Sequence, residues 1–278
     1  METNEIKKED YEEPACPFCT DQFSENPPVK PIPRSRVIEK LDEYLSRNDY
    51  SSAERHLIYW LNEAEIGHDH QGMFMICNEL MGLYRKTGRK DKAFEYAEKA
   101  LELSDYLDYS DAVSGGTAYV NAATVYKAFG RSDRSIPLFI KAEKIYLSRL
   151  PENDARIGGL YNNMGLAYAD LGEYEKALGC YEKALVVMSN IENGEAEQAI
   201  THLNIADLIY AQNGRIISDI DIQSRLDKAE ELLDTASLPR DGYYAFVCEK
   251  CAPVFGFYGR AEFEKELSER ARSIYERA

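Results

Sequence analysis

The feature that most constrains the fold is a glycine that recurs at equal steps with the same neighbours. Gly88, Gly130, Gly172 and Gly214 follow one another at steps of 42 residues. A tyrosine lies four residues before each glycine, at Tyr84, Tyr126, Tyr168 and Tyr210, and an alanine lies twelve residues after the first three, at Ala100, Ala142 and Ala184. Around Gly172, apolar residues recur at three- and four-residue steps on both sides, which predicts two amphipathic helices joined by a tight turn. One such hairpin cannot bury its apolar face alone, so the repeat predicts a stack of hairpins.

On these residues the chain resembles the tetratricopeptide-repeat family, in which a glycine marks the turn and alanine recurs on the second helix. The step of 42 residues is longer than the usual repeat of about 34 and is similar to that of the family's long-helix variants. The resemblance implies an all-α fold, a right-handed α-solenoid of tandem helical hairpins that forms a tetratricopeptide-like superhelix.

The pattern divides the chain into a tail and a solenoid. Residues 1–33 are acidic and proline-rich, which predicts a disordered tail. Residues 34–278 are expected to form the solenoid, with hairpins at about 35–65, 73–104, 116–149, 158–189, 200–237 and 241–278. Asn48 takes the place of the turn glycine in the first hairpin. The fifth hairpin carries extra residues, 215–224, whose isoleucines at 216, 217, 220 and 222 predict a packed extension.

Charge and hydropathy exclude several partners. The net charge of −16 would repel nucleic acid and anionic membranes. The first residues, METNEIKKEDYEEP, lack the apolar core of a signal peptide, and no apolar run is long enough to cross a membrane. We therefore expect a cytoplasmic protein whose six cysteines are thiols.

Two pairs of cysteines have C-x-x-C spacing. For Cys16 and Cys19, in the tail, three interpretations stay open: half of a zinc site, a redox pair, or an apolar patch that docks on the first helices. Cys248 and Cys251 occupy positions that the repeat register assigns to the core, where cysteine acts as a small hydrophobe. We expect no cofactor, and no metal site apart from the weak candidates Cys16 and Cys19.

No catalytic motif is present in the sequence. The chain lacks a phosphate-binding loop, a nucleophile elbow and a zinc-protease motif. The His68-Asp69-His70 segment falls between two predicted hairpins, which indicates a polar loop. The sequence therefore predicts a protein that is not an enzyme.

The family resemblance implies a binding groove, formed mainly by the first helix of each hairpin, that takes peptides or helices of partner proteins. In the family's geometry the residues ten, nine, three and two before each turn glycine face this groove. They include a row of asparagines and a basic cluster: Asn78, Asn121, Asn162, Asn163, Asn204, Arg85, Lys86 and Lys127. Amides both donate to and accept from a peptide backbone. The basic residues resemble, incompletely, the family's clamp for a C-terminal carboxylate. The alternative is that the asparagines satisfy contacts between helices and the lysines are solvated.

The predicted function is a protein-interaction scaffold that binds a partner peptide or helix, with an acidic segment or a free C-terminal carboxylate favoured. Two alternatives stay open. The first is a peptide-sensing regulatory protein, although no helix-turn-helix effector is visible. The second is a zinc-linked assembly in which Cys16 and Cys19 of two chains share one metal.

Overall fold

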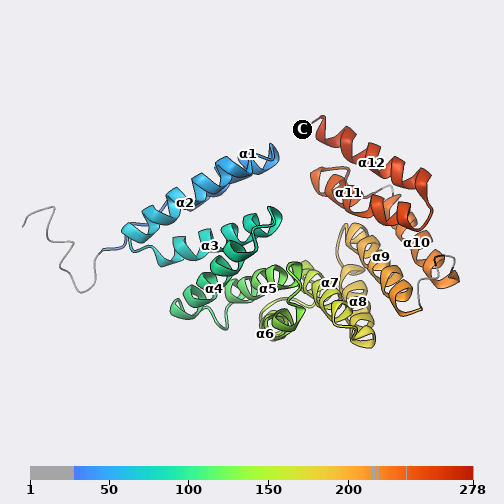
Figure 1. Cartoon of the computed structure of the whole chain (residues 1–278), viewed down its shortest axis with the longest axis horizontal. Helices are drawn as coiled ribbons and strands as arrows, with labels where there is room; N and C mark the ends of the chain where they lie inside the picture. The colour runs from blue at the N-terminus through green and yellow to red at the C-terminus, as the bar shows by residue number, and fades with distance from the viewer. Residues whose placement is uncertain (1–27, 214–216, 218, 236, 278) are drawn as a thin grey trace, which may run out of the picture. The chain divides into compact units, whose positions relative to one another are not determined.

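The described residues are helical throughout, without a strand (Figure 1). The computed structural model describes residues 28–213, 217, 219–235 and 237–277. Its helices are α1 (Arg34–Ser46), α2 (Tyr50–Ile66), α3 (His70–Lys86), α4 (Lys90–Tyr106), α5 (Val113–Ala128), α6 (Ser132–Arg149), α7 (Ala155–Asp170), α8 (Tyr174–Met188), α9 (Glu195–Gln212), α10 (Ile220–Leu233), α11 (Gly242–Phe257) and α12 (Ala261–Tyr275). None of these helices is both long and apolar enough to cross a membrane, a statement limited to the described part of the chain.

The chain divides into two compact units, Met1–Leu80 and Met81–Ala278, which we describe separately. In the first, α1 packs against α2. In the second, helices pair in chain order as α5 with α6, α7 with α8, α9 with α10, and α11 with α12. Neighbouring hairpins join where α6 packs on α7 and α8 packs on α9, while α11 packs on α9. In this unit the first helices lie on the inner side of the stack (Figure 1). The predicted all-α fold of stacked hairpins is confirmed.

The turns inside the hairpins share one capping geometry. The turn glycines Gly88, Gly130, Gly172 and Gly259 have φ between 71° and 85°, in the left-handed region that suits glycine. After Gly88, the Arg89 N–H donates to the Tyr84 carbonyl at 2.9 Å, and the same bond joins Arg131 to Tyr126, Glu173 to Tyr168 and Arg260 to Phe255. This is the Schellman helix end, which satisfies carbonyls that would otherwise lack a donor. The aromatic residue four before the glycine is therefore the residue whose carbonyl closes the helix. Gly214 lies outside the described residues.

The first turn of the chain uses asparagine in the same way. Asn48 has φ of 55°, and the Asp49 N–H donates to the Tyr44 carbonyl at 2.9 Å. Asparagine tolerates the left-handed region better than other residues with a side chain. The proposed replacement of glycine by Asn48 is confirmed.

Glycine on a first helix lets an aromatic ring of the second helix lie against the backbone. A Cβ atom at Gly165 of α7 would lie 2.6 Å from Cδ1 of Tyr181 on α8, and one at Gly116 of α5 would lie 2.8 Å from Cε1 of Tyr146 on α6. Tyr181 is fully buried by this contact. The small residues of the repeat are thus required by close packing between helices.

Cations of the second helices cover tyrosine rings of the first helices at two positions of the repeat. Four residues after the turn glycine, Lys92 lies over Tyr84 at 5.0 Å, Arg134 over Tyr126 at 4.1 Å and Lys176 over Tyr168 at 5.4 Å. Eleven residues after it, Lys141 lies over Tyr119 at 5.2 Å and Lys183 over Tyr161 at 4.8 Å. Such contacts contribute about 0.5–1 kcal/mol each at exposed sites. The sequence analysis missed these contacts, because it compared tyrosines, glycines and alanines across the repeats and not the cations.

The insertion in the fifth hairpin differs from the expectation of a packed extension. Ile222 is fully buried, but Ile217 is 41% exposed and Ile220 is 85% exposed. The helix α10 begins at Ile220, and its buried stripe starts at Ile222 and continues through Leu226 and Ala229, so Ile220 lies off that face. The packed extension is therefore wrong for Ile217 and Ile220, and Ile216 lies outside the described residues.

Asp69 lies in the connection between α2 and α3, where the sequence predicted a polar loop, but its side chain is buried and has a structural role. Its carboxylate is buried before the start of α3 and accepts hydrogen bonds from the backbone N–H groups of Ile32 at 3.0 Å and Gly72 at 2.9 Å. Arg34 adds an ion pair at 3.1 Å. One side chain thus caps α3 and holds the segment that precedes α1.

Cys248 and Cys251 are core residues, as predicted. Both are buried in the cluster shared by α9, α10, α11 and α12. Burial raises the pKa of the Cys251 thiol to about 12. The thiols at these positions are therefore protonated at neutral pH and unsuited to metal binding.

Candidate functional site

Three cations from distant parts of the second unit act on one another at its inner side. Arg85 lies near the end of α3, Lys127 near the end of α5 and Lys250 on α11. The pKa of Lys127 is lowered mainly by burial and further by the charges of Lys250 and Arg85, while Asp170 acts in the opposite direction. Within the described residues none of the three cations forms an ion pair. We call Arg85, Lys127 and Lys250 the inner basic cluster.

Burial differs among the three cations of the cluster. Lys127 is half-buried, so water screens its charge less than it would on an open surface, while Arg85 and Lys250 are exposed. The surrounding protein lowers the pKa of both Lys127 and Arg85. Among the described residues, neither Arg85 nor Lys127 forms an ion pair, although the Asp170 carboxylate acts on Lys127 electrostatically. Lys86, the other basic residue predicted to line the groove, is exposed at the end of α3.

Most of the predicted asparagine row donates to its own protein. Asn162 is buried, and its Nδ2 donates to Thr201 Oγ1 of α9 at 2.8 Å, which ties α7 to α9. Asn163 donates to the Gly159 carbonyl at 2.9 Å, and Asn78, in the first unit, donates to the Phe74 carbonyl at 2.9 Å. Asn121 is half-buried on α5. The amide of Asn162 could meet a ligand only by giving up Thr201.

Asn204 differs from the other asparagines. Its Nδ2 is buried and finds no hydrogen-bond partner among the described residues. Asn204 and Tyr243 lie 42 residues after Asn162 and Thr201, yet the Tyr243 hydroxyl donates to Glu197. The Asn204 amide N–H group at the inner side of α9 therefore has no acceptor among the described residues.

An exposed aromatic stripe on α11 borders the inner basic cluster, and the sequence analysis missed it. Tyr243, Phe246 and Phe257 are each about half exposed, at 49%, 52% and 52%. Their spacing places them on one face of the helix with Lys250 between them. The opposite face of α11 is fully buried, so the helix is apolar on both sides. Exposed aromatic groups beside a charged cluster are typical of an interaction surface.

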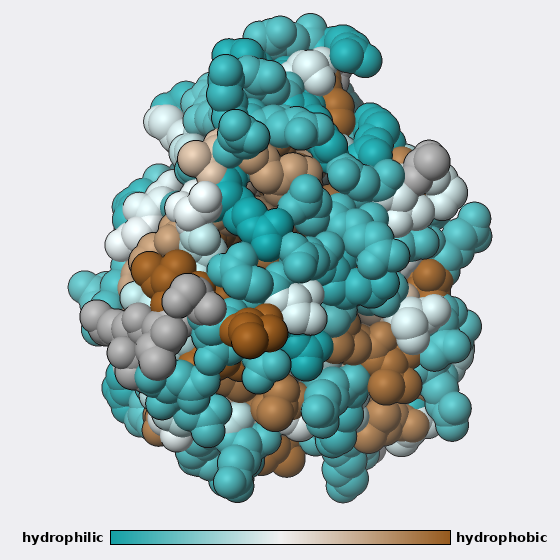
Figure 2. Space-filling view, turned by 90° about the vertical axis from the view of Figure 1, so that its right-hand side faces the viewer, coloured by the Kyte–Doolittle hydropathy of each residue, from teal (hydrophilic) through white to brown (hydrophobic). Residues whose placement is uncertain are grey.

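Figure 2 shows the side toward α10 and α12 as mainly hydrophilic, with separate hydrophobic patches. The signal was present in the sequence, since the aromatic residues of α11 recur at three-residue and longer helical steps outside the core register. The sequence alone could not show that these aromatic residues are exposed, because this depends on no other described residue covering that face of α11.

A cavity of about 380 Å³ lies between α9 and α11 at one end of this stripe. It is lined by Asp207, Tyr210, Pro253, Val254 and Phe257. Asp207 Oδ1 accepts a hydrogen bond from the Tyr258 hydroxyl at 2.8 Å. The surrounding protein raises the pKa of Asp207, and the bond from Tyr258 offsets this only in part.

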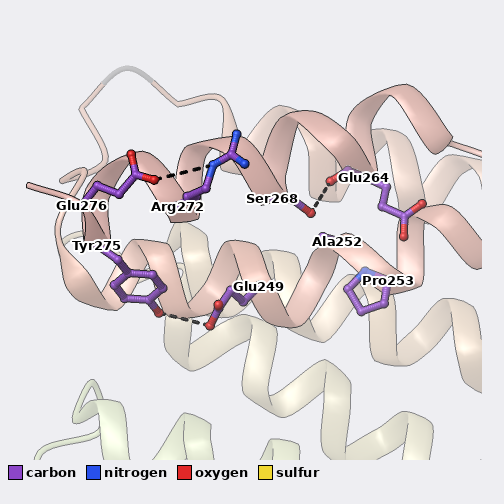
Figure 3. A pocket seen from close by; sticks show the side chains of 8 residues that line it. All are labelled: Glu249, Ala252, Pro253, Glu264, Ser268, Arg272, Tyr275 and Glu276. Atoms are coloured by element: carbon purple, nitrogen blue, oxygen red, sulfur yellow. Dashed lines mark hydrogen bonds and ion pairs between the residues drawn. The ribbon is translucent and has the colours of Figure 1, made fainter. Parts of the chain in front are cut away.

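A second cavity, of about 620 Å³, lies between α11 and α12 (Figure 3). Its polar groups bind one another: Tyr275 donates to Glu249 at 3.2 Å, Ser268 donates to the Glu264 carbonyl at 2.9 Å, and Arg272 lies 4.0 Å from Glu276. None of these polar groups indicates a particular class of ligand.

A third cavity, of about 530 Å³, lies between α8, α9 and α10 and contains His202. His202 is buried, and its Nδ1 lies 3.3 Å from Arg225 Nη1. Burial, Arg225 and Lys228 lower the pKa of His202 to about 4. The imidazole is therefore neutral at physiological pH and accepts from Arg225.

His202 makes the stability of the second unit depend on pH. Between pH 6.5 and 4 the unfolded chain takes up a proton at His202 that the folded chain does not, so the free energy of unfolding falls as pH falls, by up to about 1.4 kcal/mol per pH unit. We expect His202→Gln to flatten this dependence in urea titrations at several pH values. The exposed His68→Asn is the control, and an unchanged slope in His202→Gln would contradict the assignment.

No group of three or more histidine, cysteine, aspartate or glutamate side chains in the described part of the chain could hold a metal ion. Cys16 and Cys19 lie outside it, so the zinc interpretation of the tail stays a prediction.

Two segments match models of the tetratricopeptide repeat, residues 82–106 and 160–190. The chain is also 24% identical over 181 residues to Protein KINESIN LIGHT CHAIN-RELATED 1 of Arabidopsis thaliana, a match that covers 63% of this chain and 27% of the plant protein. The chain therefore spans about a quarter of the length of this relative.

Solved structures show a similar fold. BtubC (BKLC) from P. vanneervenii has a TM-score of 0.63 at 23% identity, with 71% of this chain and 78% of that chain covered. The pilF protein of Pseudomonas aeruginosa has a TM-score of 0.53 at 16% identity, with 88% and 93% covered. At these identities the likeness concerns the arrangement of helices.

Proposed function

Because this chain is a tetratricopeptide-repeat protein, we propose that it is a non-enzymatic scaffold that binds a peptide or helix of a partner protein along the inner side of its first helices. The observation that carries the proposal is the inner basic cluster, in which Arg85, Lys127 and Lys250 have no ion pair within the described residues. The cytoplasmic location expected from the sequence belongs to the same proposal.

The cluster favours a partner with an acidic segment or a free C-terminal carboxylate. The molecule carries a net charge of −16, so its general field repels anions, and an anionic segment gains most where cations gather. Partly buried cations form stronger charge-assisted hydrogen bonds to a carboxylate than fully solvated ones. Arg85 offers a planar fork for two carboxylate oxygens, while Lys127 and Lys250 act as point charges.

Backbone contacts would come from the amides beside the cluster. Asn204 supplies a buried donor without a partner among the described residues, which a peptide carbonyl would satisfy. Asn121, Asn163 and Lys86 complete the predicted lining. Asn162 takes a different role here, since its bond to Thr201 sets the position of α9.

The test uses peptides selected from a random library with free C-terminal carboxylates against the full chain. We expect Lys127→Glu to weaken their binding by about tenfold or more, because it replaces an attractive charge by a repulsive one at a partly buried site. Lys144→Glu, an exposed position on α6 with the same change of charge, is the matched control. Capping the peptide carboxylate as an amide should produce a similar loss. Equal binding to both variants, or no selected peptide, would contradict the proposal.

A further inference from the structure

Among the described residues, the turn tyrosine of the fifth hairpin has no cation over its ring, unlike its counterparts in other hairpins. Tyr84, Tyr126 and Tyr168 each lie under a lysine or arginine placed four residues after the turn glycine. Tyr210 is the next member of the series, but the connection from Gln212 to Ile220 is longer than in those hairpins. No cation from the described residues lies over Tyr210.

Aromatic groups of α11 surround Tyr210 instead. Its ring lies 5.1 Å from that of Phe257 at 90° and 5.8 Å from that of Tyr258 at 88°. With Pro253 and Val254 these rings border the cavity of about 380 Å³. Phe257 is 52% exposed, so aromatic surface is open to an incoming group.

A carboxylate without a cation completes the cavity. Asp207 lies three residues before Tyr210 on α9, and among the described residues it receives a hydrogen bond from Tyr258 but forms no ion pair. Lys250, on the facing helix, interacts electrostatically with Glu197 and Lys127, and Asp207 is not among the groups it affects. The Asp207 side chain is exposed to solvent, so an incoming cation can reach its carboxylate, and the surrounding protein raises its pKa.

We propose that the cavity formed by Asp207, Tyr210, Pro253, Val254 and Phe257 accepts a lysine or arginine side chain of the partner peptide, and we call it the cation pocket. The proposal deepens the proposed function and rests on it. An aromatic floor and an unpaired carboxylate are the two groups that a guanidinium or ammonium binds best. In this pocket the partner's cation would take the place that Lys92, Arg134 and Lys176 occupy in other hairpins.

The cation pocket and the inner basic cluster have opposite charges, and this defines the class of ligand. A peptide with a basic residue for the pocket and an acidic segment or terminus for the cluster would satisfy both. A uniformly acidic or uniformly basic peptide would meet repulsion at one of the two. Opposite charges at separate points also fix the direction in which the peptide lies.

The experiment titrates the full chain with two small probes and measures their binding by saturation-transfer NMR. One probe is Nα-acetyl-arginine amide, and the other is Nα-acetyl-norleucine amide, whose unbranched side chain is neutral. We expect the arginine probe to bind about tenfold more tightly, and Asp207→Asn to abolish this preference. Tyr210→Leu should weaken the binding of the arginine probe as well. Glu182→Gln, an exposed site on α8 with the same loss of charge, should change nothing.

The outcomes separate this proposal from that of the groove. Equal affinity for both probes, or an unchanged preference in Asp207→Asn, overturns the cation pocket whatever the peptides do. Lys127→Glu should lose the selected peptides and keep the arginine probe. If it loses the probe too, with helicity unchanged by circular dichroism, the two sites are not separate and the proposal fails.

Discussion

Replacing Gly165 by alanine is expected to lower the free energy of unfolding by about 2 kcal/mol, since overpacking a close contact between helices costs about 1–3 kcal/mol. The added Cβ would lie 2.6 Å from Cδ1 of Tyr181, a ring that is fully buried and cannot move away without opening the hairpin of α7 and α8. Urea unfolding followed by far-UV circular dichroism measures the change.

Gly179→Ala is the matched control, because it makes the same exchange in α8 where a Cβ would meet nothing within 4 Å. There alanine should raise the free energy of unfolding by about 0.5–1 kcal/mol through its better helix propensity. The two variants are therefore expected to shift the urea midpoint in opposite directions. A Gly165→Ala variant as stable as the wild type would show that α7 and α8 pack less closely than the contact with Tyr181 requires.

Replacing Asp69 by alanine is expected to cost about 2–4 kcal/mol in the first unit, because removing a buried hydrogen-bonded charge leaves its partners unsatisfied. The N–H groups of Ile32 and Gly72 lose their acceptor, and Arg34 loses its ion pair. The chain has one tryptophan, Trp60 in α2, so fluorescence reports on this unit.

Asp42→Ala, an exposed aspartate on α1 of the same unit, should change the midpoint of the fluorescence transition very little. A shift in Asp69→Ala no larger than in Asp42→Ala would mean that the Asp69 bonds contribute nothing net to folding. A fluorescence transition that moves while the helical signal of the second unit stays in place would localise the effect to residues before Met81.

Local features of this protein were open to prediction from the sequence. The turns follow from a glycine or Asn48 four residues after an aromatic, because the Schellman bond spans only a few residues of backbone. The contact between Gly165 and Tyr181 joins two helices of one hairpin, which the repeat pattern predicted to pack together, although the pair itself was not predicted. The burial of Cys248 and Cys251 followed from the same register, with no knowledge of tertiary structure.

The interior positions of polar residues were less predictable. Asn162 looked like a groove residue by its place in the repeat, but its partner Thr201 lies on the next first helix, and only the packing of α7 on α9 shows that the two meet. The burial of Asp69 was not predicted, because the N–H group of Ile32 that donates to its carboxylate belongs to a segment whose path the sequence does not reveal. The length of the α9 to α10 connection was visible in the sequence, while the absence of a cation over Tyr210 among the described residues was not.

The sequence by itself determined the repeated hairpin, its turns and its core register, since each depends on contacts between residues close in the chain. Only the tertiary structure decided where charges and rings gather. Phe257 packs on Tyr210 because α9 and α11 are neighbouring first helices in contact, and the curvature of the stack brings Lys250 of α11 close enough to Lys127 of α5 to act on it electrostatically. That curvature is the sum of small rotations between hairpins, so residues far apart in the chain come together at positions that no local pattern encodes.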